Sequence, residues 1–551
     1  MNGAESLVKA LSDAGTQVIF GYPGGAVLPI YDVLYDKGPR HILVRHEQGA
    51  ALAADGYARA SGEVGVCLAT SGPGATNLVT GIANAYLDSV PMVAITGNAP
   101  KSELGRDAFQ EVDFLGITMP IVKHSFLVLH PEDIAQAVHD AFHIAQSGRP
   151  GPVVIDIPKD VLLAEVQNHS HCAHTETAPC YASEALLKQA KAMLEDARSP
   201  LVYGGGGIGI AGCVDTFRSF VETLQLPTVL TLKGLGALPT DHPLLVGMLG
   251  MHGNKAANLA VQSCDVLVCV GARFDDRVTG HLERFAPNAK VIHLDIDPAE
   301  VGKRRDSDIP LIGTLSHSLK TLTQTVKPSD WAQNCEALSA QEKPVFDVQD
   351  GVNPEAFLYE LGRAVPKTSI VTSDVGQHQM WVAQHYTMHH PQQHLSSGGL
   401  GTMGFGLPAA IGAQLACPGS LVVNVSGDGG IMMNIQELAT IYRYQLPIKV
   451  VVIDNARLGM VRQWQDLFLD RRYSEVDLSD NPDFAELAKA FQIPAIQLQH
   501  SKDVAATIDA IVHTKGPLLV HVLVHPEGMV WPIVPPGCAN EEMLEAPCPS
   551  L

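Results

Sequence analysis

An aspartate and an asparagine stand at the ends of two successive apolar segments, where their side chains are able to hold a metal ion. Asp428 lies in the turn 426–430, directly after the apolar run 421–425, and Asn455 follows the next apolar run, 27 residues further on. The two runs predict strands of one strand–helix–strand unit, whose carboxyl ends meet at the edge where open α/β sheets bind ligands. Carboxylate and amide oxygens suit Mg²⁺, and glycine turns admit a diphosphate to backbone N–H groups. A plain strand-to-helix turn is the alternative.

A glutamate and two glycine-rich segments mark further candidate sites. Glu47 begins an alanine-rich helical stretch after the apolar run 42–44. At this position it is either a functional residue or a charge that only stabilises the helix N-terminus. Five glycines fall within residues 398–406, which indicates close approach of the backbone to another group. The glycine run 204–207 follows an apolar run but is a weak dinucleotide-binding signal alone, because no acidic residue stands at the expected distance.

The elements that must position these residues repeat one order: a short apolar run, a glycine turn and a helical stretch. Continuous apolar strands separated by helices indicate parallel sheets that are covered on both faces, an α/β fold of doubly wound sheets. The runs that predict strands are 64–69, 92–96, 153–157, 201–203, 266–270, 291–295, 370–372, 421–425, 448–453 and 518–524.

Two polar stretches, 165–183 and 326–354, predict linkers. They divide the chain into domains 1–165, 184–330 and 355–538, each within the usual range of domain sizes, followed by a tail, 539–551. Residues 71–98 and 426–455 share one order of features: a Ser-Gly-x-Gly turn, an Asn, a helical stretch, a proline, a strand and a final Asn. We therefore expect the first and third domains to have similar folds.

The composition excludes some classes of partner. The 551 residues include 37 basic and 58 acidic side chains, for a net charge of −21, which argues against nucleic acid or an anionic membrane as the main partner. The ten cysteines form no CxxC pair, which is typical of free thiols in a reducing compartment. No apolar run approaches the roughly 18 residues of a membrane span, so we expect a cytoplasmic protein.

The spacing of Asp428 and Asn455 is that of the thiamine diphosphate enzymes, and the chain resembles this superfamily. From residue 1 to about 545 it is similar to the acetohydroxyacid synthases (acetolactate synthases), specifically to large catalytic subunits of the biosynthetic, FAD-containing type. The resemblance implies a thiamine diphosphate fold in the first and third domains and a Rossmann-like FAD-binding domain between them. It is carried also by the segments 21–25, 108–111, 150–152, 273–277, 374–381 and 458–465.

The resemblance also implies roles for individual residues. Glu47 would contact the aminopyrimidine ring and activate the cofactor, Met403 would support its bent shape, and Trp464 would line the pocket that prefers 2-oxobutyrate. Arg273 would reach the carboxylate of the second substrate. The alternative for this segment is a cluster of surface ion pairs in which the arginines 273 and 277 bind the aspartates 275 and 276. The alternative for Trp464 is an aromatic side chain buried in the core. The implied catalytic set is Gly25, Glu47, Phe109, Gln110, Lys159, Arg273, Met403 and Trp464.

The implied cofactors are thiamine diphosphate, Mg²⁺ and FAD. The thiamine diphosphate set is Val375, Gly376, Gln377, His378, Gly401, Met403, Gly427, Asp428, Gly429, Gly430, Asn455 and Met460. The metal set is Asp428, Asn455 and Arg457. The FAD set is Gly204, Gly205, Gly206, Lys233, Gly234, Met251, His252, Gly271, Ala272, Arg273, Asp275, Arg277, Asp295 and Ile296.

The implied activity removes CO₂ from pyruvate and joins the remaining two-carbon unit to a second 2-oxoacid. Pyruvate would give 2-acetolactate and 2-oxobutyrate would give 2-aceto-2-hydroxybutyrate, the first common step of branched-chain amino acid synthesis. FAD would be structural, and the active site would lie between subunits of a homodimer or homotetramer, with a small regulatory subunit as a further partner.

Other members of the superfamily remain as alternatives. The segment 273–277 and Trp464 argue against a pyruvate oxidase and an FAD-free catabolic synthase, and Glu47 argues against a glyoxylate carboligase. A non-catalytic regulatory homologue would have lost Glu47, Asp428 or Asn455, and all three are present. The pairs 98–99 and 430–431 and Arg106 depart from the usual pattern. The first pair and Arg106 would lie near the substrate pocket, which leaves the substrate preference and the inhibitor sensitivity open.

Overall fold

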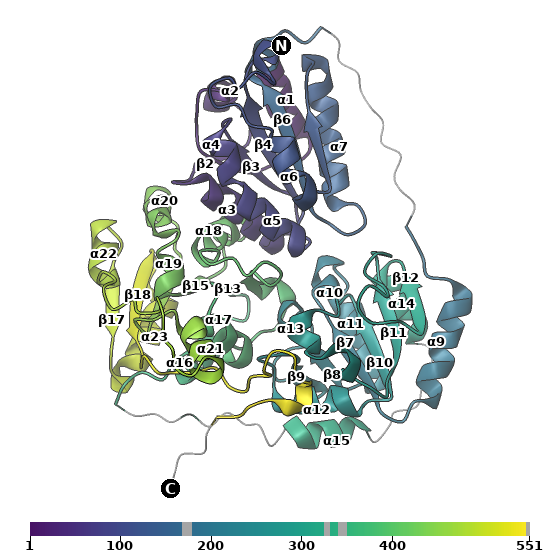
Figure 1. The fold of residues 1–551 in the computed structure, drawn as a ribbon. Coiled ribbons are helices and arrows are strands. Elements are labelled where there is room, and N and C mark those ends of the chain that lie inside the picture. The colour runs from purple at the N-terminus through teal and green to yellow at the C-terminus, as the bar shows by residue number, and fades with distance from the viewer. Residues whose placement is uncertain (168–178, 324–330, 340–345, 347–349, 547–551) are drawn as a thin grey trace.

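Three parallel sheets form the framework of the protein. The computed structural model describes residues 1–167, 179–323, 331–339, 346 and 350–546. Each sheet has six strands, and the strands of each sheet pair in parallel. The sheets lie within residues 18–158, 200–312 and 370–523, and Figure 1 shows them at the top, right and left of the molecule. This architecture confirms the predicted α/β fold. Residues 168–178 of the first predicted linker and residues 326–330, 340–345 and 347–349 of the second lie outside the described residues.

The N-terminal sheet has the strand order β2-β1-β3-β4-β6-β5. Its inner strands β1, β3, β4 and β6 are buried along their whole length, as expected of parallel strands that are covered on both faces, whereas the edge strands β2 and β5 are partly exposed. The strands are β1 (Val18–Gly21), β2 (Arg40–Leu43), β3 (Gly65–Ala69), β4 (Met92–Asn98), β5 (His124–Leu127) and β6 (Pro152–Pro158). The helices are α1 (Gly3–Asp13), α2 (Leu28–Asp36), α3 (Glu47–Ser61), α4 (Pro73–Asn77), α5 (Val79–Leu87), α6 (Phe114–Thr118), α7 (Ile134–Gln146) and α8 (Lys159–Leu163).

The middle sheet has the order β12-β11-β10-β7-β8-β9, in which β7 and β10 are adjacent and the chain winds outward in both directions. This is the order of dinucleotide-binding sheets, which bind ligands at the point where the winding reverses. The strands are β7 (Pro200–Gly204), β8 (Thr228–Leu230), β9 (Leu245–Met248), β10 (Val266–Val270), β11 (Lys290–Asp295) and β12 (Ile309–Ile312). The helices are α9 (Glu184–Asp196), α10 (Gly207–Ile210), α11 (Val214–Leu224), α12 (Lys255–Ser263), α13 (Asp276–Thr279), α14 (Leu315–Leu322) and α15 (Trp331–Ser339).

The C-terminal sheet, β14-β13-β15-β16-β18-β17, repeats the connectivity of the N-terminal sheet strand for strand, which confirms the predicted similarity of the two domains. The strands are β13 (Ile370–Ser373), β14 (His394–Ser396), β15 (Val422–Gly427), β16 (Lys449–Asp454), β17 (Ala495–Leu498) and β18 (Leu518–Leu523). The helices are α16 (Pro354–Ala364), α17 (Gln377–His385), α18 (Gly406–Ala416), α19 (Asp428–Ile431), α20 (Leu438–Tyr444), α21 (Gly459–Phe468), α22 (Phe484–Ala490) and α23 (Val504–His513).

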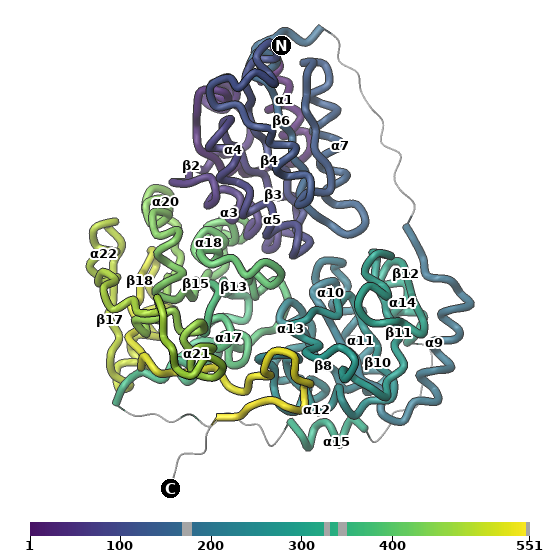
Figure 2. The backbone as a smooth tube through the Cα atoms, viewed as in Figure 1, coloured from purple at the N-terminus to yellow at the C-terminus, as the bar shows by residue number. Residues whose placement is uncertain are grey.

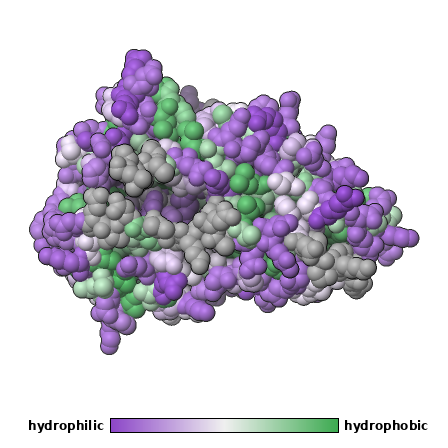
Figure 3. Space-filling model, turned by 90° about the horizontal axis from the view of Figure 1, so that it is seen from below, coloured by the Kyte–Doolittle hydropathy of each residue, from purple (hydrophilic) through white to green (hydrophobic). Residues whose placement is uncertain are grey.

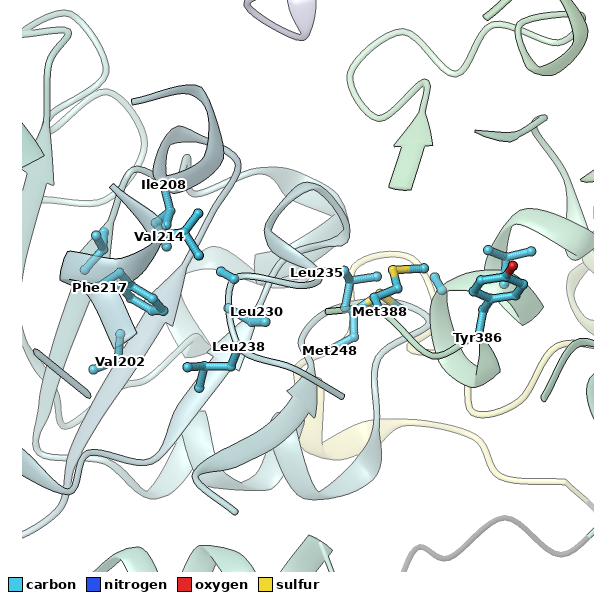
Figure 4. Close-up of a cluster of buried hydrophobic side chains, with 14 of the residues drawn as sticks. Val202, Ile208, Val214, Phe217, Leu230, Leu235, Leu238, Met248, Tyr386 and Met388 are labelled. Carbon is cyan, nitrogen blue, oxygen red and sulfur yellow. The ribbon is translucent and has the colours of Figure 1, made fainter. Parts of the chain in front are cut away.

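The domains share apolar cores. One cluster of buried side chains continues from the middle domain into the C-terminal domain, and Figure 4 shows Leu235 and Met248 beside Met388 at this junction. A second cluster joins the N-terminal and C-terminal domains where α3 packs on α18. Gly56 and Gly412 allow this contact, because a Cβ atom on either would collide with the backbone of the facing helix. The helix that begins at Glu47 is therefore held directly against the C-terminal domain.

The C-terminal segment leaves its own domain and packs on the middle domain, as the path of the tube in Figure 2 shows. The backbone N–H of His281 donates to the carbonyl of Cys538 at 2.9 Å, and Arg284 forms 2.9 Å ion pairs with Glu541 and Glu542. The face seen from below is mainly hydrophilic, with hydrophobic residues in small groups (Figure 3). None of the described helices combines the length and the apolar character that a membrane span requires.

Candidate active site

A pocket lies at the carboxyl edge of the C-terminal sheet. It is lined by residues of the turns that follow β13, β15 and β16, the position at which open α/β sheets bind ligands. It contains most of the residues predicted to hold thiamine diphosphate. These are Val375, Gly376, Gln377, His378, Met403, Gly427, Asp428, Gly429, Gly430, Asn455 and Met460. Gly401, the remaining predicted residue, lies two residues before Met403 in the same loop.

The candidate metal ligands meet in this pocket. The Oδ2 atom of Asp428 is buried and has no hydrogen-bond partner among the described residues. Burial and the nearby carboxylate of Asp454 raise the pKa of Asp428 to about 7, so a cation would relieve the cost of its charge. The amide of Asn455 donates to the Gln377 side chain at 3.1 Å, which fixes the orientation of its oxygen. These hard oxygen donors fit Mg²⁺.

Arg457, the third predicted member of the metal set, lines the same pocket. Its guanidinium group forms an ion pair with Asp477 and donates to the carbonyl of Ala456 at 3.0 Å. A guanidinium has no acceptor atom, so only the backbone carbonyl of Arg457 is able to bind a cation.

Buried polar side chains hold the turns of the pocket in place. His378 accepts a hydrogen bond from the backbone N–H of Gly427 at 3.2 Å, and burial lowers the pKa of His378 to about 3, which keeps it a neutral acceptor. Asp374 accepts from the backbone N–H groups of Val375 at 2.7 Å and Gly404 at 2.9 Å. Sequence reasoning missed this role of Asp374, although its place directly after an apolar run was a signal that could have found it.

The glycines provide room for a diphosphate. A Cβ atom on Gly429 would lie 2.8 Å from the Leu458 side chain, and one on Gly430 would lie 2.9 Å from the Asp374 carboxyl carbon. Gly376 precedes α17 with a φ of 148°, a conformation that side-chain-bearing residues rarely adopt. The residues therefore fit a diphosphate group beside a metal ion.

The predicted residues of the N-terminal domain form a separate group. Glu47 begins α3 and accepts a 2.9 Å hydrogen bond at Oε2 from the Asn77 amide. Phe109 is 89% exposed, and Gln110 has a φ of 59° and packs against Gly72. Gly25 is exposed, and Lys159 starts α8 directly after β6. These side chains stand at one edge of the N-terminal sheet but do not line the pocket, whose lining residues all belong to the C-terminal domain.

The middle domain forms a cradle at the point where its sheet reverses. The turn after β7 packs closely against the turn after β10. A Cβ atom on Gly205 would collide with Gly271 and Ala272, so only a glycine permits this approach. A Cβ atom on Gly234 would lie 2.5 Å from the Gly204 carbonyl oxygen, so the turn 232–234 closes the third side. The cradle thus unites the predicted residues Gly204, Gly205, Gly206, Lys233, Gly234, Gly271 and Ala272.

The next strand of the middle domain carries an acidic end. Asp295 ends β11, beside β10, and burial raises its pKa to about 6. Ile296 follows it, and Arg149 of the N-terminal domain binds this loop through Asp297 at 3.4 Å and Glu300 at 2.7 Å. Glycine turns and an acidic strand end fit a dinucleotide such as FAD. Sequence reasoning missed the Arg149 bridge, because it joins residues far apart in the chain.

The two predicted arginines of the segment 273–277 have different surroundings. Arg273 pairs with Asp275 at 3.1 Å and Arg277 with Asp276 at 3.9 Å, the ion pairs that were the alternative for this segment. The guanidinium of Arg277 also lies over the ring of Trp464, 5.8 Å from its centroid, and contacts the Met251 sulfur at 3.6 Å. A cavity of about 130 Å³ between Arg277, Met251 and the C-terminal segment adjoins this pair. His252, the next residue after Met251, is half-buried, and desolvation lowers its pKa to about 4.

Asn98, one of the departures from the family pattern, also has a clear environment. Its amide donates to the buried Asp156 carboxylate at 2.5 Å, as the Thr96 hydroxyl does at 2.7 Å. Burial raises the pKa of Asp156 to about 7. The departure therefore belongs to a buried polar cluster of the N-terminal domain.

Comparison with protein families places the chain among thiamine enzymes. Three family models match: the thiamine pyrophosphate enzyme N-terminal TPP binding domain over residues 1–117, the central domain over 187–322 and the C-terminal TPP binding domain over 374–522. The fold and the pocket therefore belong to an enzyme that depends on thiamine pyrophosphate.

Comparison with curated proteins narrows this class. The chain is 52% identical over 546 residues to "Acetolactate synthase isozyme 2 large subunit" of Escherichia coli (strain K12), covering 99% of this chain and 100% of that one. It is 46% identical to "Probable acetolactate synthase large subunit" of Methanocaldococcus jannaschii, covering 98% and 94% of the two chains. The chain belongs to the family of acetolactate synthase large subunits, which confirms the resemblance and the acetolactate synthase function predicted from the sequence.

Proposed function

We propose that the chain condenses pyruvate with a second 2-oxoacid, pyruvate or 2-oxobutyrate, with loss of CO₂, and that it needs Mg²⁺ and FAD besides thiamine diphosphate. The observation that carries this proposal is the buried, unpartnered Oδ2 atom of Asp428 in a pocket of this family. Bound thiamine diphosphate supplies a stabilised carbanion, which is the chemistry that decarboxylation and carboligation require.

The residues of the chain would bind and orient the reacting groups. Asp428 and Asn455 would hold the metal ion, and the glycine turns would donate backbone N–H groups to the diphosphate. Met403 lines the pocket and offers an adaptable apolar surface to a ring system. Glu47, oriented by Asn77, would hold a proton at its carboxylate. Gly25, Phe109, Gln110 and Lys159 would face the substrate from the N-terminal domain.

The geometry of one chain supports an active site shared between subunits. The pocket has a volume of about 60 Å³, well below the roughly 300–1,000 Å³ of pockets that enclose small ligands. Glu47 does not line it, and Phe109 is 89% exposed. A second copy that presents its N-terminal domain to this pocket would complete the site. We therefore propose a homodimer, or a tetramer built from it, and a small regulatory subunit as a further partner, as the name "large subunit" of the relatives implies.

The geometry also supports a role for Trp464 and Arg277 in the choice of the second substrate. Trp464 lies one turn after Met460 on α21, and Arg277 covers its ring. A cation beside a rigid apolar wall suits a 2-oxoacid, whose carboxylate and alkyl group need different neighbours. An apolar pocket separates substrates that differ by one methylene about 10- to 200-fold.

A competition assay tests this function. The full-length protein with thiamine diphosphate, Mg²⁺ and FAD receives pyruvate and 2-oxobutyrate together, and both condensation products are quantified. We expect both products, a flavin absorbance spectrum in the purified protein, and a Trp464→Leu variant that makes relatively less 2-aceto-2-hydroxybutyrate. Trp331→Leu, on α15 of the middle domain, is the matched control and should keep the wild-type ratio. Absence of both products from folded, cofactor-loaded protein would contradict the proposal.

A further inference from the structure

A buried carboxylate stands where the three domains meet. Asp88 follows α5 of the N-terminal domain, and its side chain is 2% exposed. Its Oδ2 atom accepts from Arg59 at 2.9 Å and from the Lys233 ammonium of the middle domain at 3.2 Å. In the C-terminal domain, the backbone N–H of Gly398 donates to the same Oδ2 atom at 3.0 Å, and the backbone N–H of Gly399 donates to Oδ1 of Asp88 at 2.7 Å. One carboxylate thus binds groups from all three domains.

The cation from the middle domain belongs to the wall of the flavin cradle. Lys233 lies in the turn Leu232–Gly234, and a Cβ atom on Gly206 would lie 3.0 Å from the Lys233 Cβ atom. The glycine turn after β7 therefore packs directly against Lys233, so a ligand seated on this turn would lie beside that residue. The ammonium group at the other end of this side chain binds Asp88 and also donates to the Ser396 carbonyl at 3.0 Å.

The loop that Asp88 holds leads to the thiamine pocket. Residues 397–404 include Gly401 and Met403, and Met403 lines the pocket. The start of the loop is fixed by Asp88, and its middle by Thr402, which donates to the Asn84 side chain at 3.1 Å. Its end is fixed by Gly404, whose N–H donates to Asp374. The position of Met403 thus depends on contacts with a neighbouring domain as well as with its own.

We propose that Asp88 and Lys233 are positioning residues that couple the flavin site to the thiamine diphosphate site, so that FAD tightens the binding of thiamine diphosphate. The inference rests on the proposed cofactors. Seating FAD restricts the turn 232–234, which places the Lys233 ammonium on Asp88 and the Ser396 carbonyl. These contacts restrict the loop that carries Met403, so thiamine diphosphate meets a loop that is already ordered.

Physical chemistry gives such a coupling a measurable size. Hydrogen bonds between charged groups in a buried setting are stronger than neutral ones, and they order the segments that they join. Ordering of a loop by one ligand reduces the entropy cost that a second ligand must meet. Couplings between two binding sites typically change affinity about 5- to 150-fold, and each ligand affects the other by the same factor.

The experiment measures the affinity of thiamine diphosphate with and without FAD. The full-length protein, at saturating Mg²⁺, is titrated with thiamine diphosphate while tryptophan fluorescence is followed, since Trp381 lines the pocket. In the wild-type protein we expect saturating FAD to lower the dissociation constant at least fivefold. In Lys233→Met, which keeps the chain length but removes the charge, we expect the two dissociation constants to agree within twofold.

Three further variants separate coupling from general damage. Lys233→Arg keeps the charge and should retain most of the FAD effect, and Asp88→Asn should lose it as Lys233→Met does. Lys489→Met removes an ammonium from an exposed ion pair with Glu486 on α22 and should leave the FAD effect at its wild-type size. A variant that does not fold is recognised by its circular dichroism. In that case, the FAD effect in the other variant, Lys233→Met or Asp88→Asn, tests the proposed coupling.

Two failures are distinguishable. A wild-type protein that binds FAD but has the same thiamine diphosphate affinity with and without it would overturn the inference and leave the proposed function intact. A Lys233→Met variant with the full wild-type FAD effect would do the same. A wild-type protein that takes up no FAD would overturn both the flavin assignment and the inference.

Discussion

The guanidinium of Arg277 lies over the indole ring of Trp464, with its Cζ atom 5.8 Å from the ring centroid. This contact joins the middle domain to α21, the helix that also supplies Met460 and Val461 to the thiamine pocket. Arg273, four residues earlier, pairs with Asp275 at 3.1 Å, while Arg277 has Asp276 at 3.9 Å in addition to the Trp464 ring. Of the two arginines, the structure therefore brings Arg277 to the residue that the family resemblance assigns to substrate choice.

The contrast between the arginines predicts different kinetics for two matched variants. Arg277→Gln should raise the KM for the second 2-oxoacid tenfold or more, because a cation next to the Trp464 ring is removed. Arg273→Gln should have a smaller effect on this KM, since its guanidinium is held by Asp275 at 3.1 Å and Arg277 is the one that lies over the Trp464 ring. Initial rates at varied 2-oxobutyrate and fixed pyruvate measure both. A larger effect from Arg273→Gln would support the assignment made from the sequence and contradict the one made from the structure.

The sequence predicted the long strands and the turns of the C-terminal site well, for a physical reason. Buried parallel strands such as β10 (Val266–Val270) are continuous apolar runs, and a glycine turn at their carboxyl end can be recognised in the sequence itself. Asp428 and Asn455 could be placed together because strand ends of one unit meet at one edge. Short strands such as β9, β14 and β17 have three or four residues, too few to show a pattern.

Contacts between domains could not be predicted, because they join residues that no periodicity relates. Asp88, Lys233 and Gly398 meet only once the three sheets have packed together. Arg277 and Arg273 are equivalent in charge and spacing, and only the fold separates the one over Trp464 from the one beside Asp275. The predicted domain limits, the metal ligands and the flavin residues stay predictions.

Glu47→Gln should lower turnover by about 100-fold or more, because a group that holds a proton in such a reaction typically contributes 10²–10⁴-fold. The amide can still accept the hydrogen bond from Asn77, so the fold and circular dichroism should not change. Acetolactate formation at saturating pyruvate measures the effect. Glu63→Gln, at an exposed position just after α3, is the control and should be fully active.

Glu47→Gln also tests whether the site is shared. Co-expression of this variant with Asp428→Asn should restore activity, since a hybrid dimer has one site with both residues intact. Activity no greater than that of the two separate variants would contradict a site formed between subunits.

Asp428→Asn should abolish the dependence of thiamine diphosphate binding on Mg²⁺, because it removes the charge of a carboxylate whose Oδ2 atom is buried without a partner among the described residues. We expect the affinity of the variant to fall at least tenfold and to become insensitive to EDTA. Calorimetric titration with and without Mg²⁺ measures this. Asp480→Asn, at an exposed position, should bind as the wild type does, and a variant that retains a strong response to Mg²⁺ would place the metal elsewhere.

The Asp156 carboxyl should make the N-terminal domain less stable as the pH rises. Burial raises its pKa from 3.8 to about 7, so between these values the folded protein holds a proton that the unfolded chain has lost. Its stabilising effect is complete below pH 4 and is lost as the pH rises through 7, at up to about 1.4 kcal/mol per pH unit.

The melting temperature between pH 5 and 8 measures this effect. Asp156→Asn should flatten the decline, because an amide does not titrate, whereas Asp36→Asn, at an exposed position on α2, should leave the slope unchanged. An equal slope in wild type and Asp156→Asn would contradict the assignment of the buried proton.

The product balance from pyruvate alone tests the central claim most directly. The purified full-length protein, loaded with thiamine diphosphate, Mg²⁺ and FAD, is given pyruvate, and the consumed substrate, released CO₂ and all organic products are quantified. We predict one acetolactate and one CO₂ for every two pyruvate molecules consumed. Acetaldehyde or acetate as the main product, or no consumption of pyruvate, would contradict an acetolactate synthase.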